Sequence, residues 1–271
     1  MERIAVLGGD ERMRLLARML KREDREVTDR PTFSALPEEA AAADRIVLPV
    51  PLERGGKLSG TDVPLGELWK VCRPGQRLYA GAVSAEAREA AQAIHLSLTD
   101  YLEREELAVR NAVPTAEGAI AAAMARLPVT LRGTRCLVLG FGRIGKLLAQ
   151  DLHALGACVS VAARRIEDLA WIDAFGYTPL PIRQMRGKLG SFRVIFNTVP
   201  QRVLDGDALR EVRKDCLLLE LASRGGFDME TAETLGIETV KASGLPGKYA
   251  PESAAYAIRQ TLERIWEEEK Q

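Results

Sequence analysis

The chain has 271 residues, which at roughly 150 residues per domain predicts about two domains. Its 38 Lys and Arg residues balance 38 Asp and Glu residues, so the formal net charge is zero. Because nucleic acids and anionic membranes attract surfaces with excess positive charge, this balance argues against both as partners. With two histidines and four cysteines that form no C-x-x-C pair, no metal site is predicted.

The N-terminal region alternates short apolar runs with helical patterns. Strands are predicted at residues 3–7, 46–50 and 78–83, the first ending in Gly8-Gly9-Asp10. No secretory signal precedes the first run, and no apolar segment approaches the roughly 18 residues that span a bilayer. We therefore expect a reduced, cytoplasmic protein whose first domain, residues 1–113, has a parallel sheet of the flavodoxin-like kind.

A different element is predicted after Pro114. Thr115 is a plausible N-cap, and residues 116–127 form an alanine-rich helical pattern that stops before Pro128. Its small side chains would permit close packing, so we expect an inter-domain helix at 114–128, although an ordinary buried helix would have the same pattern.

A second strand–helix series follows, and it predicts a Rossmann-like domain over residues 129–250. A C-terminal helix, residues 251–271, carries Ala255, Ile258, Leu262 and Ile265 on one face and is expected to pack back toward the N-terminal domain. The predicted fold is therefore α/β, with two Rossmann-like domains, parallel sheets flanked by helices, and a cofactor cleft between the domains. The predicted strands of the second series are residues 136–139, 158–163, 194–198, 217–221 and 237–242.

Residues 140–145 read G-x-G-x-x-G between a predicted strand and a predicted helix. In this context the first glycine permits a tight turn, the second lets the backbone approach a pyrophosphate, and the third permits close helix packing. The start of the helix adds unpaired N–H groups and a positive dipole end. The predicted phosphate-binding residues are Gly140, Phe141, Gly142, Arg143, Ile144 and Gly145.

Two arginines follow the second strand of this series. NAD-binding proteins place a carboxylate about 20 residues beyond the glycines to bind the ribose 2′-hydroxyl. Here that place holds Arg164 and Arg165. Because a guanidinium group can bind two oxygens of a phosphate at once, the pair favours NADP(H) over NAD(H).

Three later loops fall where strands should end on the cofactor side of the sheet. Ligands of open α/β sheets bind beyond the carboxyl ends of the strands, so these loops are predicted to complete the cofactor site. The cofactor-binding candidates on them are Asn197, Thr198, Val199, Pro200, Ala222, Ser223, Leu245 and Pro246.

Six segments spread over nearly the whole chain carry a family resemblance. They are IAVLGGD near the N-terminus, IVLPVP at residues 46–51, NAVPTAEGAI at 111–120, LVLGFGRIGKLLA at 137–149, LELASRGG at 219–226 and GLPGKYAP at 244–251. The segments at 111–120 and 244–251 are more specific than the glycine pattern, which every nucleotide-binding relative shares. Together they resemble the dipicolinate synthase A-subunit family of spore-forming bacteria. The architecture is also similar to that of 2-hydroxyacid dehydrogenases.

The resemblance implies NADP-dependent oxidation of a dihydrodipicolinate-type compound to pyridine-2,6-dicarboxylate in a branch of the lysine pathway, in the mother cell of a sporulating bacterium. It also implies a second, flavoprotein-like subunit, and we expect a homo-oligomer. A dicarboxylate substrate requires cations, so Lys248 and Arg224 are candidates, with Asp10 and Asn111 as further substrate-binding candidates.

Glu117 and Thr115 are candidates for proton transfer or substrate positioning, and Lys248 is the third catalytic candidate. Two alternatives remain open. The chain could be a non-catalytic NADP(H)-binding scaffold or sensor, or a generic 2-hydroxyacid dehydrogenase. The second is weakened because such enzymes depend on a histidine late in the chain, and none follows His153.

Overall fold

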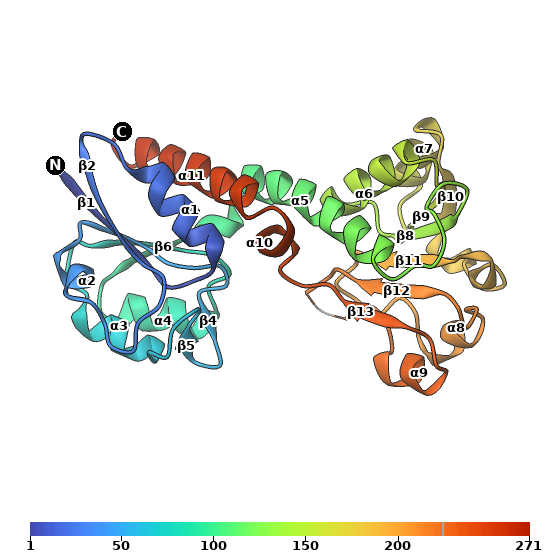
Figure 1. Ribbon diagram of the computed structural model, residues 1–271, viewed down its shortest axis with the longest axis horizontal. Helices are drawn as coiled ribbons and strands as arrows, with labels where there is room; N and C mark the ends of the chain where they lie inside the picture. Colours follow the sequence, from blue (N-terminus) through green and yellow to red (C-terminus); the bar gives the residue numbers. More distant parts are fainter. Residues whose placement is uncertain (224) are drawn as a thin grey trace. The chain divides into compact units, whose positions relative to one another are not determined.

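The structure is a computed structural model that describes residues 1–223 and 225–271. The chain divides into two compact units, each described by itself. Unit 1 comprises Met1–Asn111 and Ala250–Gln271, and unit 2 comprises Ala112–Tyr249. Both units are α/β, each with a parallel sheet flanked by helices, so this part of the predicted fold is confirmed (Figure 1).

Unit 1 has a five-stranded parallel sheet in the order β2-β1-β3-β6-β7. Numbered within the unit, this is the order 2-1-3-4-5 of flavodoxin-like sheets. The segment after β3 includes a small hairpin, β4 (Glu53–Arg54) and β5 (Lys57–Leu58). The strands of the sheet are β1 (Glu2–Leu7), β2 (Arg25–Arg30), β3 (Arg45–Val47), β6 (Arg77–Ala80) and β7 (Ser97–Asp100).

Helices cover both faces of this sheet because the side chains of its strands alternate between two apolar cores. Ile4 and Val6 of β1 belong to the core under α1 (Glu11–Leu20) and α11 (Pro251–Glu268). Ala5 and Leu7 belong to the opposite core (Figure 1). That core is covered by α2 (Glu38–Ala42), α3 (Leu65–Val71) and α4 (Ala85–Ala93).

The C-terminal helix α11 is held on unit 1 by an aromatic and ionic cluster. Trp266 is buried and meets the Tyr79 ring edge to face, with 5.8 Å between ring centroids. Glu269 accepts hydrogen bonds from the Tyr79 hydroxyl and from two guanidinium groups, Arg45 at 2.6 Å and Arg77 at 2.6 Å. The apolar face expected from Ala255, Ile258, Leu262 and Ile265 is buried, as predicted.

The Glu269 cluster should make stability depend on pH. Burial would raise the pKa of Glu269, but hydrogen bonds from Tyr79, Arg45 and Arg77 outweigh burial and lower it below the ordinary 4.5. The carboxylate therefore stabilises the fold above pH 4.5, and the contribution is lost as pH falls through the lower folded value. Glu269→Gln is expected to lose about 1–3 kcal/mol at about pH 7, and in thermal unfolding the difference from wild type should shrink as the pH falls below 4.5. A difference that stays constant over this range of pH would contradict the role.

Unit 2 has a six-stranded parallel sheet in the order β10-β9-β8-β11-β12-β13. Numbered within the unit this is 3-2-1-4-5-6, the Rossmann order, and the strand order reverses between β8 and β11. The strands are β8 (Arg135–Leu139), β9 (Cys158–Ala163), β10 (Thr178–Pro181), β11 (Val194–Asn197), β12 (Leu217–Glu220) and β13 (Thr239–Lys241).

Two cores again lie on opposite faces of the sheet. Cys136 and Val138 of β8 face the core under α6 (Arg143–Ala154) and α7 (Ile166–Ala174). Leu137 and Leu139 face the core under α8 (Gly206–Arg210) and α9 (Met229–Thr234) (Figure 1). Short 3-10 turns at Ile182–Gln184 and Leu189–Ser191 join β10 to β11.

The helix expected to start at Thr115 begins ten residues earlier, so that expectation was wrong. Helix α5 spans Glu105–Met124 and contains Pro114. Pro114 has no N–H, so the helix lacks the hydrogen bond from residue 114 to the carbonyl of Arg110, which is an exposed residue. Thr115 is therefore not an N-cap, and the backbone N–H groups of residues 115–118 do not form a helix start.

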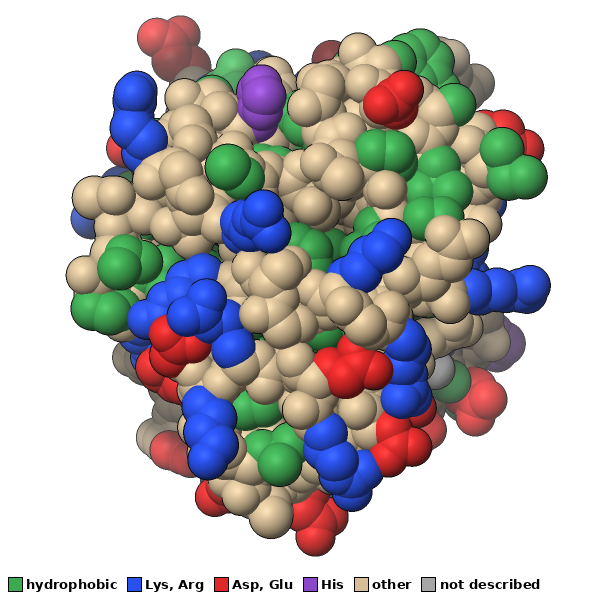
Figure 2. Space-filling view, turned by 90° about the vertical axis from the view of Figure 1, so that its right-hand side faces the viewer, with side chains coloured by type: hydrophobic (Ala, Val, Ile, Leu, Met, Phe, Trp, Pro, Cys, Tyr) green, Lys and Arg blue, Asp and Glu red, His purple; other side chains and the backbone are tan. Residues whose placement is uncertain are grey.

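Two further observations concern the surface. No helix in the described ranges is long and apolar enough to cross a membrane. Figure 2 shows one face of the molecule, on which Lys and Arg side chains are interspersed with Asp and Glu side chains.

Candidate nucleotide-binding site

The glycine loop after β8 has the backbone geometry of a phosphate-binding turn. Gly140 has φ +99°, a conformation that disfavours other residues. A Cβ atom on Gly145 would lie 2.2 Å from the carbonyl oxygen of Gly140, so helix α6 can pack here only without a side chain. Gly142 differs, because a Cβ atom there would meet no atom within 4 Å.

Gly142 is the N-cap residue of α6, with φ −81° and ψ −163°. Any residue tolerates that backbone conformation, and no side chain of the described residues caps the helix there. The first turn of α6 carries no acidic side chain. The N–H groups and the positive dipole end of a twelve-residue helix are therefore available to an anion in front of Gly142.

A pocket of about 570 Å³ opens beside this loop. Of the described residues that line it, Lys146, Arg164, Arg165 and Arg202 are basic and only Asp168 is acidic. This excess of cations favours an anionic ligand. The other lining residues are Gly140, Phe141, Gly142, Ala163, Ile182, Thr198, Val199, Pro200, Gln201 and Val203.

Arg164 and Arg165 lie directly after β9, as the sequence predicted, and both are exposed. Arg165 is the N-cap residue of α7, and its guanidinium group lies 3.5 Å from Glu167, a pair that is mostly exposed and therefore weak. Both arginines line the same pocket as the glycine loop, so the structure brings these two predicted features together.

The residues after β11 have two different roles. The Thr198 hydroxyl donates a hydrogen bond to the carbonyl oxygen of Leu139 at 2.8 Å, which ties this loop to the end of β8. Thr198, Val199 and Pro200 line the pocket. Asn197 is fully buried and does not line it, and its side-chain amide donates a hydrogen bond to Glu220.

The remaining cofactor candidates do not line this pocket. Ala222 is half-buried, Ser223 is exposed, and Leu245 is buried in the core of unit 2. The segment with Leu245 and Pro246, expected to be a loop, is a short helix, α10 (Leu245–Tyr249). Proline is tolerated in the first turn of a helix, which the loop prediction overlooked.

The structure places the segments of the catalytic candidates next to each other in unit 2. A Cβ atom on Gly118 of α5 would lie 3.0 Å from both Leu245 and Tyr249 of α10. Glu117 is exposed, and Thr115 is half-buried. Lys248 is exposed with its ammonium group 5.3 Å from the centre of the Tyr249 ring. None of the three candidate side chains lines the glycine-loop pocket among its described residues.

Glu117 also acts electrostatically on α6. Burial, and then the negative charge of Glu117, raise the pKa of Asp151. The two carboxyl groups are thus close enough to influence each other.

The substrate-binding candidates lie in different surroundings. Asp10 caps α1 and accepts hydrogen bonds from the Arg12 guanidinium group, the shortest at 2.7 Å. Burial alone would raise the pKa of Asp10, but Arg12 outweighs it and the pKa is lowered. Asn111 is half-buried in α5, and Arg224 lies outside the described residues.

Sequence reasoning missed three charged lining residues. Lys146 lies one helical turn after Gly142, and that spacing alone places both on the start of α6. Arg202 and Asp168 reach the pocket only because β8, β9 and β11 are neighbours, which no local pattern reveals.

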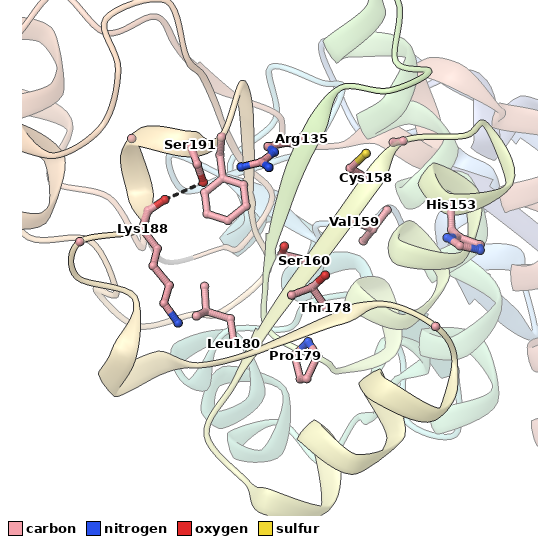
Figure 3. Close-up of a pocket in the computed structure, with 15 residues that line it drawn as sticks. Arg135, His153, Cys158, Val159, Ser160, Thr178, Pro179, Leu180, Lys188 and Ser191 are labelled. Carbon is pink, nitrogen blue, oxygen red and sulfur yellow. Dashed lines mark hydrogen bonds between the residues drawn. The ribbon is translucent and has the colours of Figure 1, made fainter.

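A larger pocket, of about 720 Å³, lies elsewhere in unit 2 (Figure 3). Its lining includes Arg135 and Cys158, the first residues of β8 and β9, and Thr178, the first residue of β10. It therefore opens at the amino ends of these strands, whereas ligands of such sheets bind at the carboxyl ends. We assign the nucleotide site to the smaller pocket for this reason.

The buried cysteines supply no nucleophile to either pocket. Burial raises the pKa of the Cys136 thiol to about 12 and that of Cys216 to about 12. Thiols with such values stay protonated and unreactive at neutral pH.

Comparison with known proteins shows which of them share this fold. No family model matches the chain. A transhydrogenase from Sinorhizobium meliloti has a TM-score of 0.75 at 16% identity, covering 98% of this chain and 93% of its own, which shows the fold alone. Fold and site together define a two-unit α/β protein whose second unit has a Rossmann-type sheet with a basic pocket beside its glycine loop.

More similar proteins narrow the class to a family. The A subunit of dipicolinate synthase from Bacillus subtilis is 33% identical over 189 residues, 69% of this chain and 64% of that protein, slightly less than two thirds of its length. The crystal structure of the Bacillus halodurans A subunit has a TM-score of 0.87 at 27% identity, covering 97% of each chain. The crystal structure of the Bacillus subtilis protein has a TM-score of 0.85 at 29% identity, covering 98% of this chain and 96% of its own. The chain belongs to the dipicolinate synthase A-subunit family.

Proposed function

We propose that this chain binds NADP(H) in the glycine-loop pocket and acts as the A subunit of a dipicolinate synthase. The reaction would oxidise a dihydrodipicolinate-type compound to pyridine-2,6-dicarboxylate. The observation that carries the proposal is the basic pocket at the strand-order reversal, in which Arg164 and Arg165 stand where NAD-binding relatives have a carboxylate. The names of the similar proteins support the substrate class.

The residues present fit such a cofactor. The open space in front of Gly142 and the uncapped start of α6 suit a pyrophosphate, and Arg164 and Arg165 suit a 2′-phosphate. Nicotinamide, when bound, would supply the acceptor for a hydride from a ring carbon of the substrate. Lys146 and Arg202 would add positive charge around the phosphates.

The chain itself would hold the substrate and take its proton. Oxidation removes two hydrogens from the dihydro ring, one as a hydride and one as a proton, and the product is aromatic. Glu117 is our candidate to accept the proton, with Thr115 positioning the substrate and Lys248 binding a carboxylate. The packing of α5 on α10 at Gly118 supports this grouping. The carboxylate of Asp10 already accepts hydrogen bonds from Arg12. Asp10 is therefore a weaker candidate for substrate binding than the sequence alone indicated.

A second, flavoprotein-like subunit, as the family implies, would complete the enzyme. The assay that tests the proposal mixes the purified chain, alone and with such a partner, with dihydrodipicolinate and NADP⁺, and follows the absorbance of dipicolinate. Product formation in either mixture supports the proposal. Binding of NADP(H) with no product in both mixtures would instead support a non-catalytic sensor or scaffold.

The cofactor preference gives a prediction. Replacing both Arg164 and Arg165 by alanine is expected to weaken NADPH binding about tenfold or more while leaving NADH binding within about twofold, because only NADPH carries the 2′-phosphate. Isothermal titration of both nucleotides measures this. Arg132→Ala, which removes an exposed arginine before β8 and outside the glycine-loop pocket, is the matched control. Tighter binding of NADH than NADPH by the wild-type chain would contradict the NADP assignment.

The catalytic assignments give another prediction. Glu117→Gln and Lys248→Ala are each expected to lower turnover more than about tenfold without changing NADPH affinity, since neither side chain lines the nucleotide pocket. Steady-state kinetics and nucleotide titration of the same preparations check both points. Unchanged turnover in either variant would remove that residue from the mechanism.

A further inference from the structure

A buried carboxyl group ends strand β12, and the mechanism above does not use it. Glu220 is 2% exposed, and its neighbour across the sheet is Asn197 at the end of β11, which is 0% exposed. Burying such groups is costly unless every hydrogen bond is made. The hydrogen-bond partners of Glu220 and Asn197 therefore indicate which segments the two side chains hold in place.

Both carboxyl oxygens of Glu220 accept hydrogen bonds from surrounding amide groups. Oε1 accepts from the Asn197 side-chain amide at 2.7 Å and from the backbone N–H of Ala222 at 3.0 Å. Oε2 accepts from the backbone N–H of Gly226 at 2.6 Å. One side chain thus holds the backbone at both Ala222 and Gly226.

Asn197 fixes the other loop. Its side-chain amide donates to the carbonyl oxygen of Val199 at 2.9 Å and accepts from the backbone N–H of Val199 at 3.1 Å. Gly226 then joins the two loops, because its carbonyl oxygen accepts from the N–H groups of Val203 at 2.8 Å and Leu204 at 3.1 Å. A Cβ atom on Gly226 would lie 2.1 Å from the Asn197 amide nitrogen, so only glycine permits this approach.

The place of these loops in the sheet indicates what they position. The glycine loop follows β8 and the arginine pair follows β9, so the adenosine half of a dinucleotide would lie over those strands. The other half must lie on the far side of the strand-order reversal, over the carboxyl ends of β11 and β12. Val199 and Pro200, whose loop Asn197 holds, line the pocket on that side.

We propose that Glu220 and Asn197 are a positioning pair that holds loop 198–204 and the described residues 222–223 and 225–226 so that they receive the nicotinamide half of the cofactor. The inference rests on the proposed binding of NADP(H). The pair does not touch the cofactor; it acts through Val199, Pro200 and the backbone of the second loop.

Glu220→Gln is the sharpest variant, since it keeps size and shape. Glutamine has one accepting oxygen, so in either orientation its amide N–H groups would face at least one donor among Asn197, Ala222 and Gly226. Glu233→Gln, at an exposed glutamate of α9, is the matched control. Gly226→Ala is a second variant, in which the added Cβ atom would collide with the Asn197 side-chain amide.

Two ligands separate positioning from general stability. NADPH has a nicotinamide, and 2′,5′-ADP carries only the adenosine and phosphate groups. Glu220→Gln and Gly226→Ala are expected to weaken NADPH binding at least about tenfold and to leave 2′,5′-ADP binding within about twofold of wild type. Amide hydrogen exchange should accelerate in residues 198–204, 222–223 and 225–228 and remain unchanged in β8 and α6.

The other outcomes would overturn the proposal, each for a different reason. Equal loss of both ligands, or faster exchange throughout unit 2, would mean that the pair merely stabilises the fold. NADPH binding close to that of wild type in both variants would mean that the loops do not receive the nicotinamide. A wild-type chain that binds neither ligand would refute the proposed function itself, and the inference with it.

Discussion

Gly142→Val is expected to lower NADPH affinity at least about a hundredfold while the chain stays folded. The Cβ of residue 142 would enter open space at the start of α6 and meet no protein atom within 4 Å, and the side chain would stand where a pyrophosphate would approach the backbone. The backbone at Gly142 suits any residue, so we expect a stability loss of no more than about 1 kcal/mol from the poorer N-cap. Titration with NADPH and thermal unfolding of the same sample measure the two effects.

Two glycine variants serve as controls. Gly145→Ala should lose stability as well as binding, because its Cβ would lie 2.2 Å from the carbonyl oxygen of Gly140 and the helix would have to shift. Gly66→Ala in α3 of unit 1 meets no atom within 4 Å and should change neither property, apart from a small gain in helix propensity. NADPH affinity close to that of wild type in Gly142→Val would show that the nucleotide does not approach this loop.

The part of the site that sequence predicted is local in the chain. The strand, the three glycines and the first turn of α6 follow one another directly, so their spacing carries the geometry. Arg164 and Arg165 were also found because they follow the end of a recognisable strand. In each case the residue itself supplies what the site requires, since glycine permits a positive φ and arginine carries a positive charge.

The missed part depends on contacts between distant segments. Arg202 and the partners of Asn197 come together only through the pairing of β11 with both β8 and β12. A buried polar pair such as Asn197 and Glu220 looks, in sequence, like two side chains at the ends of strands and therefore like ligand contacts. Only the burial of both side chains, and their hydrogen bonds to the loops, distinguish the pair from such contacts.

The error at Thr115 has a different cause. Proline and a following threonine are a strong local indication of a helix start, yet α5 continues through Pro114. Ala112, Ala116 and Ala119 are buried on one face of that helix, and this packing outweighs the single hydrogen bond that Pro114 removes. Tertiary burial, which sequence does not show, decided the boundary.

Trp266→Ala is expected to cost unit 1 about 3–5 kcal/mol, the usual loss when a buried tryptophan leaves a cavity. Trp266 is 2% exposed, and its ring lies near the guanidinium groups of Arg25 at 5.0 Å and Arg45 at 4.9 Å. Its removal would also loosen the end of α11, next to which Glu269 makes its hydrogen bonds. Denaturant unfolding followed by hydrogen exchange should therefore show the loss first in β1, β6 and α11.

Two matched variants separate the size of the ring from its polar atom. Trp171→Ala removes a tryptophan that is 58% exposed on α7 and should cost less than about 1 kcal/mol. In the described residues the Trp266 indole N–H is buried without a hydrogen-bond partner, a cost that phenylalanine lacks. Trp266→Phe should therefore cost far less than Trp266→Ala. Equal losses in the two Trp266 variants would contradict the role assigned to the volume that the aromatic ring fills.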